Sequence, residues 1–219
     1  MKTNQEYKNA ALAALKGNWA PAVVATIIYM IIAIAVYMLT GIYDETTMTV
    51  NAALVLAGAS VLISIFFSYP LSVGYYNAYK ELALKGDNNC TANLFKSGFG
   101  KYFRNVWGMF LMGLFMFLWT LLFIIPGLIK AFAYILTPYI LADYPELSAN
   151  EAINLSRDMM KGHKFDCFCL GLSFFGWGLL AVLTLGVGMI WLMPYCYTAM
   201  AVFYQDVKAE YEAKTSSIN

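Results

Sequence analysis

Side chains that could bind a metal ion are gathered around the single histidine of this 219-residue chain. His163 and Cys167 are four positions apart, as two ligands on one helix face would be, and Cys169 and Cys90 are further candidates. However, Cys167 and Cys169 are two positions apart, so they point to nearly opposite sides of a helix. Cysteine is also common in apolar interiors. We therefore expect no metal and no cofactor.

Motifs of catalytic chemistry are missing from the chain. It has no Gly-x-Ser-x-Gly, no His-Glu-x-x-His and no phosphate-binding glycine loop. Its basic residues are partly balanced by acidic ones, which does not indicate nucleic-acid binding, although they would attract anionic lipid headgroups. The sequence predicts a protein that is not an enzyme.

A candidate docking surface is predicted around the stretch 148–161. Its apolar residues recur at helical spacing on one face, which is typical of an amphipathic helix lying against an apolar surface. The helix is either a connector packed beneath a membrane bundle or a docking site for a cytoplasmic protein partner. The residues that would contact a partner are Arg157, Asp158, Lys161 and His163.

Charged residues are absent from most of the chain, and this absence indicates the class of protein. Hydrophobic residues make up 61% and charged residues 12%, against about 25% charged in an ordinary soluble domain. Because a water-facing surface needs polarity along most of its elements, a soluble enzyme is excluded and an all-α polytopic membrane protein is predicted. The stretches without Asp, Glu, Lys or Arg are 17–43, 46–79, 105–129, 131–142 and 167–205.

The apolar stretches divide into about six spans, arranged as three helical hairpins. A helix needs about 20 apolar residues to cross a bilayer. Pro126-Gly127 and the Gly186/Gly188 pair are turn signals within the two longer regions, and Pro70 marks where the second span becomes an extension. Re-entrant pairs over 105–143 and 168–205 are the alternative. The predicted spans are 19–40, 50–72, 105–125, 128–143, 168–186 and 189–205.

Helix signals also occur outside the spans. Thr3 with Glu6, and Ser148 with Glu151, fit the capping box, in which the hydroxyl and the carboxylate bind free amides reciprocally. The two helices that start there, and the extension of the second span, each end in Lys-Gly, where glycine takes the left-handed conformation. These Lys-Gly pairs end at Gly17, Gly86 and Gly162.

The basic residues orient this arrangement. All 14 Lys and Arg except Lys130 fall in segments on one side of the predicted membrane, which the positive-inside rule makes cytoplasmic, with both termini. Lys130 either reaches the outer interface or pairs with Asp44 or Glu45. The predicted organisation is a cytoplasmic amphipathic helix at 1–18, a membrane domain at 19–206 with cytoplasmic connectors 80–104 and 144–167, and a cytoplasmic tail at 207–219.

Several short motifs between residues 10 and 206 closely resemble domain-of-unknown-function family 975, a family of bacterial integral membrane proteins. The resemblance implies a multi-pass protein of the bacterial cytoplasmic (inner) membrane, and it supplies no catalytic residues. Members often have an acidic residue where this chain has Gly171. The motifs are Leu15-Lys-Gly-Asn-Trp19, Ile125-Pro-Gly-Leu-Ile-Lys130, Thr137-Pro-Tyr-Ile-Leu-Ala-Asp143, Ser148-Ala-Asn-Glu-Ala152, Ser156-Arg157, Met160-Lys-Gly-His-Lys164, Leu172-Ser-Phe-Phe-Gly-Trp177 and Trp191-Leu-Met-Pro-Tyr195.

These observations favour a non-enzymatic scaffold, envelope or accessory protein of unknown molecular activity. The alternative is a component of a small-molecule or lipid transporter or channel, which would use the broken hairpins as a pathway. No charged residue is predicted at the centre of a span, where ion-coupled transport would need one. A polar cavity lined by several spans would favour transport, and a tightly packed interior would favour the scaffold.

Overall fold

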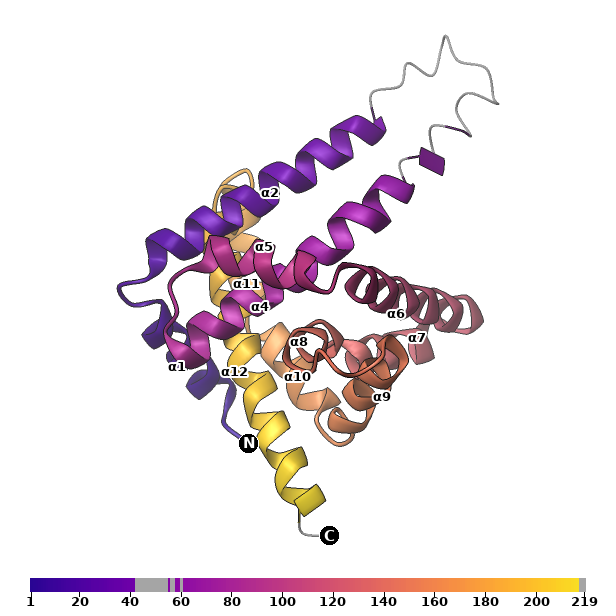
Figure 1. The fold of residues 1–219 in the computed structure, drawn as a ribbon. Helices are drawn as coiled ribbons and strands as arrows, with labels where there is room; N and C mark the ends of the chain where they lie inside the picture. The colour runs from indigo at the N-terminus through magenta and orange to yellow at the C-terminus, as the bar shows by residue number, and fades with distance from the viewer. Residues whose placement is uncertain (42–54, 56–57, 60, 217–219) are drawn as a thin grey trace.

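The computed structural model describes residues 1–41, 55, 58–59 and 61–216, and every regular element among them is helical (Figure 1). The elements are α1 (Asn4–Leu15), α2 (Trp19–Gly41), the π-helical turn η1 (Ser64–Ser68), α4 (Tyr69–Lys85), α5 (Cys90–Gly100), α6 (Tyr102–Leu122), α7 (Ile124–Tyr134), α8 (Thr137–Asp143), α9 (Ala149–Met159), α10 (Lys164–Leu172), α11 (Phe175–Leu183) and α12 (Met189–Ser216). The predicted all-α class is confirmed.

Within the described residues, four helical stretches are long and apolar enough to cross a membrane. They are Trp19–Val36, Tyr102–Leu122, Ile125–Asp143 and Lys164–Leu183. The predicted count of six spans and their arrangement as three hairpins are not confirmed. Part of the predicted span 50–72 lies outside the described residues, and α12 runs without interruption past residue 206, where we expected a tail to begin.

The turn between α6 and α7 is not at Pro126-Gly127, as predicted, but at Phe123. That residue is extended, with φ −158°, and α7 begins directly after it. Pro126 therefore lies in the first turn of α7, where a missing N–H removes no helical hydrogen bond. A Cβ atom on Gly127 would lie 2.7 Å from Oγ1 of Thr120, so the glycine permits close contact between α6 and α7.

Two predicted spans are each divided into two helices. The stretch 128–143 is interrupted between α7 and α8, where Pro138 is at the start of α8 and cannot continue a preceding helix. The stretch 168–186 is interrupted between α10 and α11, where the Ser173 hydroxyl donates to the carbonyl of Leu170 at 2.7 Å. A serine bonded this way offers the backbone an alternative to a continuous helix.

The predicted helix ends are confirmed. Both capping boxes form, at Thr3 for α1 and at Ser148 for α9. Gly17, Gly86 and Gly162 have φ angles of 83°, 67° and 90°. This is the left-handed conformation that glycine adopts with little strain, so each Lys-Gly pair ends its helix as expected.

Helix α5 was not predicted, and glycines position it against α4. A Cβ atom on Gly74 would lie 1.7 Å from the carbonyl oxygen of Leu94, and one on Gly98 would lie 2.6 Å from that of Pro70. The backbones of α4 and α5 therefore touch directly, which explains why the connector 80–104 folds back onto α4.

Tyrosines form much of the core between α2, α4, α8 and α12. Tyr75 and Tyr76 of α4 both contact Tyr197 of α12 edge to face, with ring centroids 4.8 and 5.0 Å apart. Tyr139 of α8 stacks on Tyr204 of α12 at 5.0 Å. Such pairs stabilise a core beyond the area that they bury, so α12 is held along its length by aromatic contacts from several helices.

Candidate functional site

Three of the predicted docking residues form an exposed cluster where α9 ends. The Asp158 carboxylate lies 2.8 Å from Nζ of Lys161 and 3.8 Å from Nε of Arg157. The Lys161 side chain is 71% exposed. Surface pairs of this kind contribute about 0–1 kcal/mol to stability, so the cluster does little to hold the fold and stays accessible.

The fourth predicted docking residue, His163, packs against α12. Its Nε2 lies 3.4 Å from Oε1 of Glu210, and its Nδ1 lies 3.7 Å from Oδ2 of Asp166. With Asp158 and Lys161 it lines a groove of about 360 Å³ that is closed by the C-terminal part of α12, whereas Arg157 is not part of the lining. Docking of a partner here stays a prediction.

The cysteines and the histidine considered as metal ligands do not come together. Cys90 is buried in the core between α2, α4 and α5, and Cys167 in the core around α8 and α12. Burial raises the pKa of the Cys90 thiol to about 11. In the described part of the chain, no group of three His, Cys, Asp or Glu side chains could hold a metal ion.

Lys130 lies at the α6–α7 hairpin. Its Nζ is 4.5 Å from the centre of the Trp119 ring, a cation–π contact between the two helices. The alternative partners Asp44 and Glu45 lie outside the described residues, so pairing with them stays a prediction.

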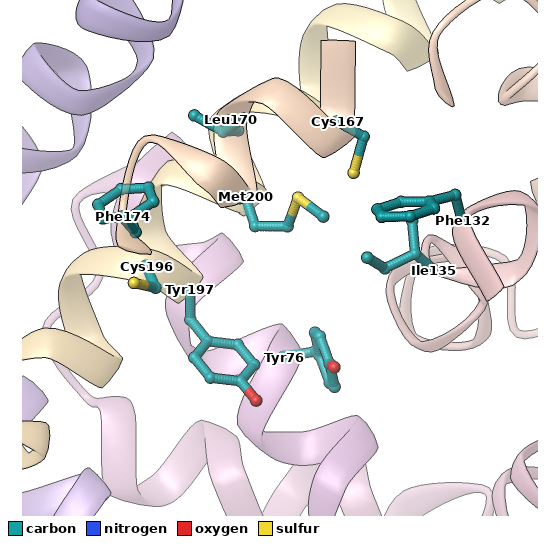
Figure 2. A pocket seen from close by; sticks show the side chains of 10 residues that line it. Tyr76, Phe132, Ile135, Cys167, Leu170, Phe174, Cys196, Tyr197 and Met200 are labelled. Atoms are coloured by element: carbon teal, nitrogen blue, oxygen red, sulfur yellow. The ribbon is translucent and has the colours of Figure 1, made fainter. Parts of the chain in front are cut away.

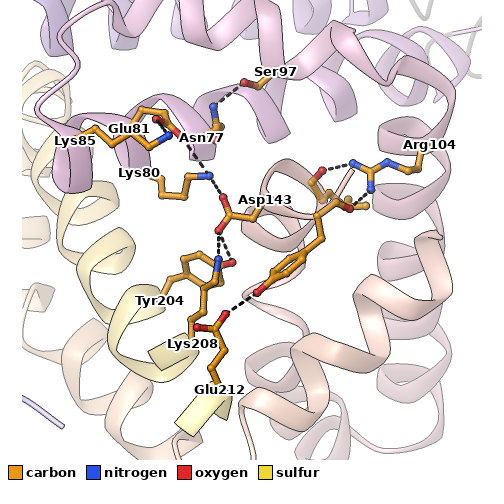
Figure 3. Close-up of polar contacts among 12 residues, drawn as sticks. Asn77, Lys80, Glu81, Lys85, Ser97, Arg104, Asp143, Tyr204, Lys208 and Glu212 are labelled. Carbon is orange, nitrogen blue, oxygen red and sulfur yellow. Dashed lines mark hydrogen bonds and ion pairs between the residues drawn. The ribbon is translucent and has the colours of Figure 1, made fainter. Parts of the chain in front are cut away.

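A cluster of polar side chains surrounds Asp143, at the end of α8 (Figure 3). Its Oδ1 pairs with Nζ of Lys80, and its Oδ2 lies 3.0 Å from Nζ of Lys208. The Tyr204 hydroxyl donates to the same Oδ2 at 2.8 Å. Lys80 is only 3% exposed and also lies 3.5 Å from Glu81. Asp143 thus joins α4, α8 and α12 at one point.

The charges of this cluster are compensated within it. Burial alone would lower the pKa of Lys208, but pairing with Asp143 raises it above its ordinary value. The ammonium group also lies 4.6 Å from the centre of the Tyr144 ring. A buried charge is tolerated only when it is paired and hydrogen-bonded, which is the case for Lys80 and Asp143.

Arg104, near the start of α6, caps the C-terminus of α8. Its guanidinium donates to the carbonyl of Leu141, to that of Tyr144 at 2.7 Å and to that of Leu147 at 3.0 Å. These carbonyls lie at or just beyond the helix end, where no backbone partner is available. A cation there also complements the helix dipole, so Arg104 fixes the helix that presents Asp143.

A polar cleft of about 540 Å³ opens beside this cluster, between α4, α5, the start of α6 and the end of α8. Asn105, in its wall, donates its Nδ2 to the carbonyls of Ser97 and Gly98, while its Oδ1 is buried without a partner among the described residues, as is Nε of Arg104. Because both atoms are buried, they are not exposed to the cleft. The charged residues of the lining are Lys80, Glu81, Lys85, Asp87, Lys96, Lys101, Arg104 and Asp143.

A second, apolar pocket of about 270 Å³ lies between α4, α7, α10 and α12 (Figure 2). Its lining includes two tyrosines, Tyr76 and Tyr197, and three sulfur-containing residues, Cys167, Cys196 and Met200. Gly171 also lines it, and a Cβ atom there would meet nothing within 4 Å. The acidic residue that the family resemblance implies at this position would therefore stand at an apolar pocket.

The Asp143 cluster was not predicted from the sequence, because its members are far apart in the chain. Lys80 and Lys208 are 63 and 65 positions from Asp143. The available signal was weak: an aspartate closes the predicted span 128–143, and basic residues were assigned to the same side of the membrane. Those features predict that Asp143 and the lysines lie on the same side of the membrane, but they do not predict that the side chains form ion pairs.

The fold defines a class: among the residues that the structure describes, every regular element is helical and four helices are long and apolar enough to span a membrane, which indicates a membrane protein. The model of the family described as "Protein of unknown function (DUF975)" matches residues 121–211, and this confirms the predicted resemblance over that stretch, while the motif Leu15–Trp19 lies outside it. The match covers Asp143, Tyr204 and Lys208 but not Lys80 or α5. No curated protein and no solved structure matches the chain.

Proposed function

We propose that this chain is a multi-pass protein of the bacterial cytoplasmic membrane, with both termini in the cytoplasm. Support comes from contacts between segments that the basic residues assign to one side. Lys2 pairs with Asp206 at 2.5 Å, Asp143 pairs with both Lys80 and Lys208, and His163 lies against Glu210. Segments in contact share a side of the bilayer, and the positive-inside rule makes that side cytoplasmic.

Reporter fusions test this orientation. Alkaline phosphatase, which is active only outside the cytoplasm, should be inactive when fused after residue 219 and active when fused after Glu45. A fluorescent protein that folds only in the cytoplasm should give the opposite pattern at the same two positions. Active phosphatase at the C-terminus would contradict the orientation.

We further propose a non-enzymatic scaffold or accessory role. The observation that carries this proposal is the mutual contact of α4, α8 and α12, which are joined by contacts between tyrosine rings and by the ion pairs of Asp143. A fold tied in this way favours a fixed platform over helices that must separate during transport. The polar cleft lies at the ends of the helices, which also favours a binding role at the membrane surface.

Docking of a cytoplasmic protein is the most specific form of this role. The groove between the end of α9 and α12 would receive the partner, with Asp158, Lys161 and His163 in its wall. Affinity capture should lose specific partners when Arg157 and Asp158 are both replaced by Ala. The matched control replaces Lys16 and Glu146, one basic and one acidic residue away from the groove. An unchanged set of partners in the first variant would count against docking.

The alternative is a transporter component, for which the apolar pocket between α4, α7, α10 and α12 is the favouring observation. A deletion strain assayed together for lipid composition, solute uptake and envelope stress separates the two. The accessory role predicts an envelope defect with normal uptake. Lost uptake with a normal envelope would overturn it in favour of transport.

A further inference from the structure

The polar cleft lies where the apolar helices end. Arg104 is the third residue of the membrane-crossing candidate Tyr102–Leu122, and Asp143 is the last residue of Ile125–Asp143. In a bilayer, the end of an apolar span lies at the level of the lipid headgroups. Phe103 and Trp107, beside Arg104 on α6, are 80% and 54% exposed, as aromatic residues of a membrane interface are.

The cleft also has positive charge that the protein does not neutralise. Five basic and three acidic side chains line it, which leaves an excess of two positive charges. All three carboxylates are engaged: Asp143 by Lys80 and Lys208, Glu81 by Lys85 at 2.7 Å, and Asp87 by amide groups of Asn89 and Asn93. By contrast, Lys96 and Lys101 are exposed and have no acidic partner in the described part of the chain.

We propose that this cleft binds the phosphate group of an anionic lipid headgroup, with Lys96 and Lys101 as its charged contacts. A lysine ammonium is a compact point charge suited to phosphate, and basic residues at the membrane surface attract anionic lipids. The size of the cleft accommodates a headgroup larger than the phosphate alone. This inference rests on the proposed membrane location but not on the accessory role.

The test measures lipid binding to the purified full-length protein by native mass spectrometry, with phosphatidylglycerol and phosphatidylcholine offered at equal concentration. The wild-type protein should retain phosphatidylglycerol preferentially. A Lys96→Gln/Lys101→Gln variant should bind phosphatidylglycerol about tenfold more weakly, because two cations near the headgroup are removed. A Lys16→Gln/Lys164→Gln variant has the same change in net charge outside the cleft and should bind like the wild type.

Two outcomes would overturn the proposal. Equal weakening in both variants would mean that general surface charge, and not the cleft, attracts the lipid. Full displacement of phosphatidylglycerol by millimolar inorganic phosphate would assign the cleft to a free phosphate instead of a headgroup. Because binding is measured on the isolated protein, neither outcome depends on the deletion phenotype that tests the accessory role.

Discussion

At the scale of single residues, Asp143 is expected to matter most for the stability of the fold. It satisfies two lysines and a tyrosine at once, and one of those lysines, Lys80, is almost completely buried. Removing one partner of a buried pair leaves the other charge uncompensated, which costs more than the pair itself contributes. The carboxylate is therefore expected to matter far more than any surface acid.

The Asp143→Asn variant should lower the free energy of unfolding by about 2 kcal/mol, less than for a fully isolated pair because Glu81 stays near Lys80. Reversible unfolding in detergent micelles measures this. Asp158→Asn is the matched control: it breaks an exposed pair and should cost no more than about 0.5 kcal/mol. Equal losses in the two variants would show that the Asp143 cluster is not a buried network.

At the residue scale, contacts within one helix end were predictable from the sequence, whereas contacts between distant segments were not. The caps at Thr3 and Ser148 were predicted correctly, because both partners of a capping box lie within four residues. The pairing of Asp143 with Lys80 was missed, because it depends on how α4 and α8 pack and not on local spacing. Local hydrogen bonds can be read from one segment, whereas long-range ion pairs cannot.

At the scale of elements, glycine positions determine which helices approach closely. Gly74 and Gly98 place the backbones of α4 and α5 in direct contact, and other residues of the two helices line the polar cleft. The sequence pattern did not predict α5, since the charged connector 80–104 lacks the long apolar run by which the other helices were found. Its position depends on a tertiary contact that only small residues allow.

Gly74→Ala should destabilise the protein by about 3 kcal/mol or more, because the added methyl group would overlap a backbone carbonyl that cannot move away alone. Gly100→Ala provides the control, since a Cβ atom at that position meets nothing within 4 Å. Thermal unfolding of the two variants in the same detergent makes the comparison. If Gly74→Ala were as stable as Gly100→Ala, α4 and α5 could not be in backbone contact.

Glycine has a different role at the helix ends. Gly162 has φ +90° and open space around it, so alanine there would be strained by its backbone conformation alone, at a cost of about 1 kcal/mol. Gly171→Ala, which has no such φ angle and no nearby atoms, should leave stability unchanged or slightly raised. Chemical denaturation that ranked the two variants in the opposite order would contradict the left-handed turn.

At the scale of the whole molecule, the two ends of the chain are held together. α1 packs along α12 (Figure 1), and the Tyr7 hydroxyl donates to Asp206 at 3.1 Å beside the Lys2–Asp206 pair. The first and last helices thereby close the bundle on the side that carries the basic residues. The overall class was predictable from charge placement, but the docking of the first helix on the last was not.

Carbodiimide cross-linking in intact membranes tests this closure, because the reagent joins an amine to a carboxylate in contact with it. Lys2 and Asp206 should form a cross-linked peptide pair that mass spectrometry identifies. The pair Lys214 and Glu210, 2.6 Å apart within α12, should react in the same sample as a positive control. A reacted control without the Lys2–Asp206 product would indicate that α1 is not docked on α12.

The Asp143 cluster also has a consequence for the order of synthesis. Lys80 leaves the ribosome well before Asp143, whereas Tyr204 and Lys208 follow Asp143 by 61 and 65 residues. Until α12 has been made, Asp143 has only part of its native set of partners. A chain that stops short of Tyr204 would lack two of the three side chains that contact the Asp143 carboxylate, so the native packing of α8 can be completed only after the last helix has been made.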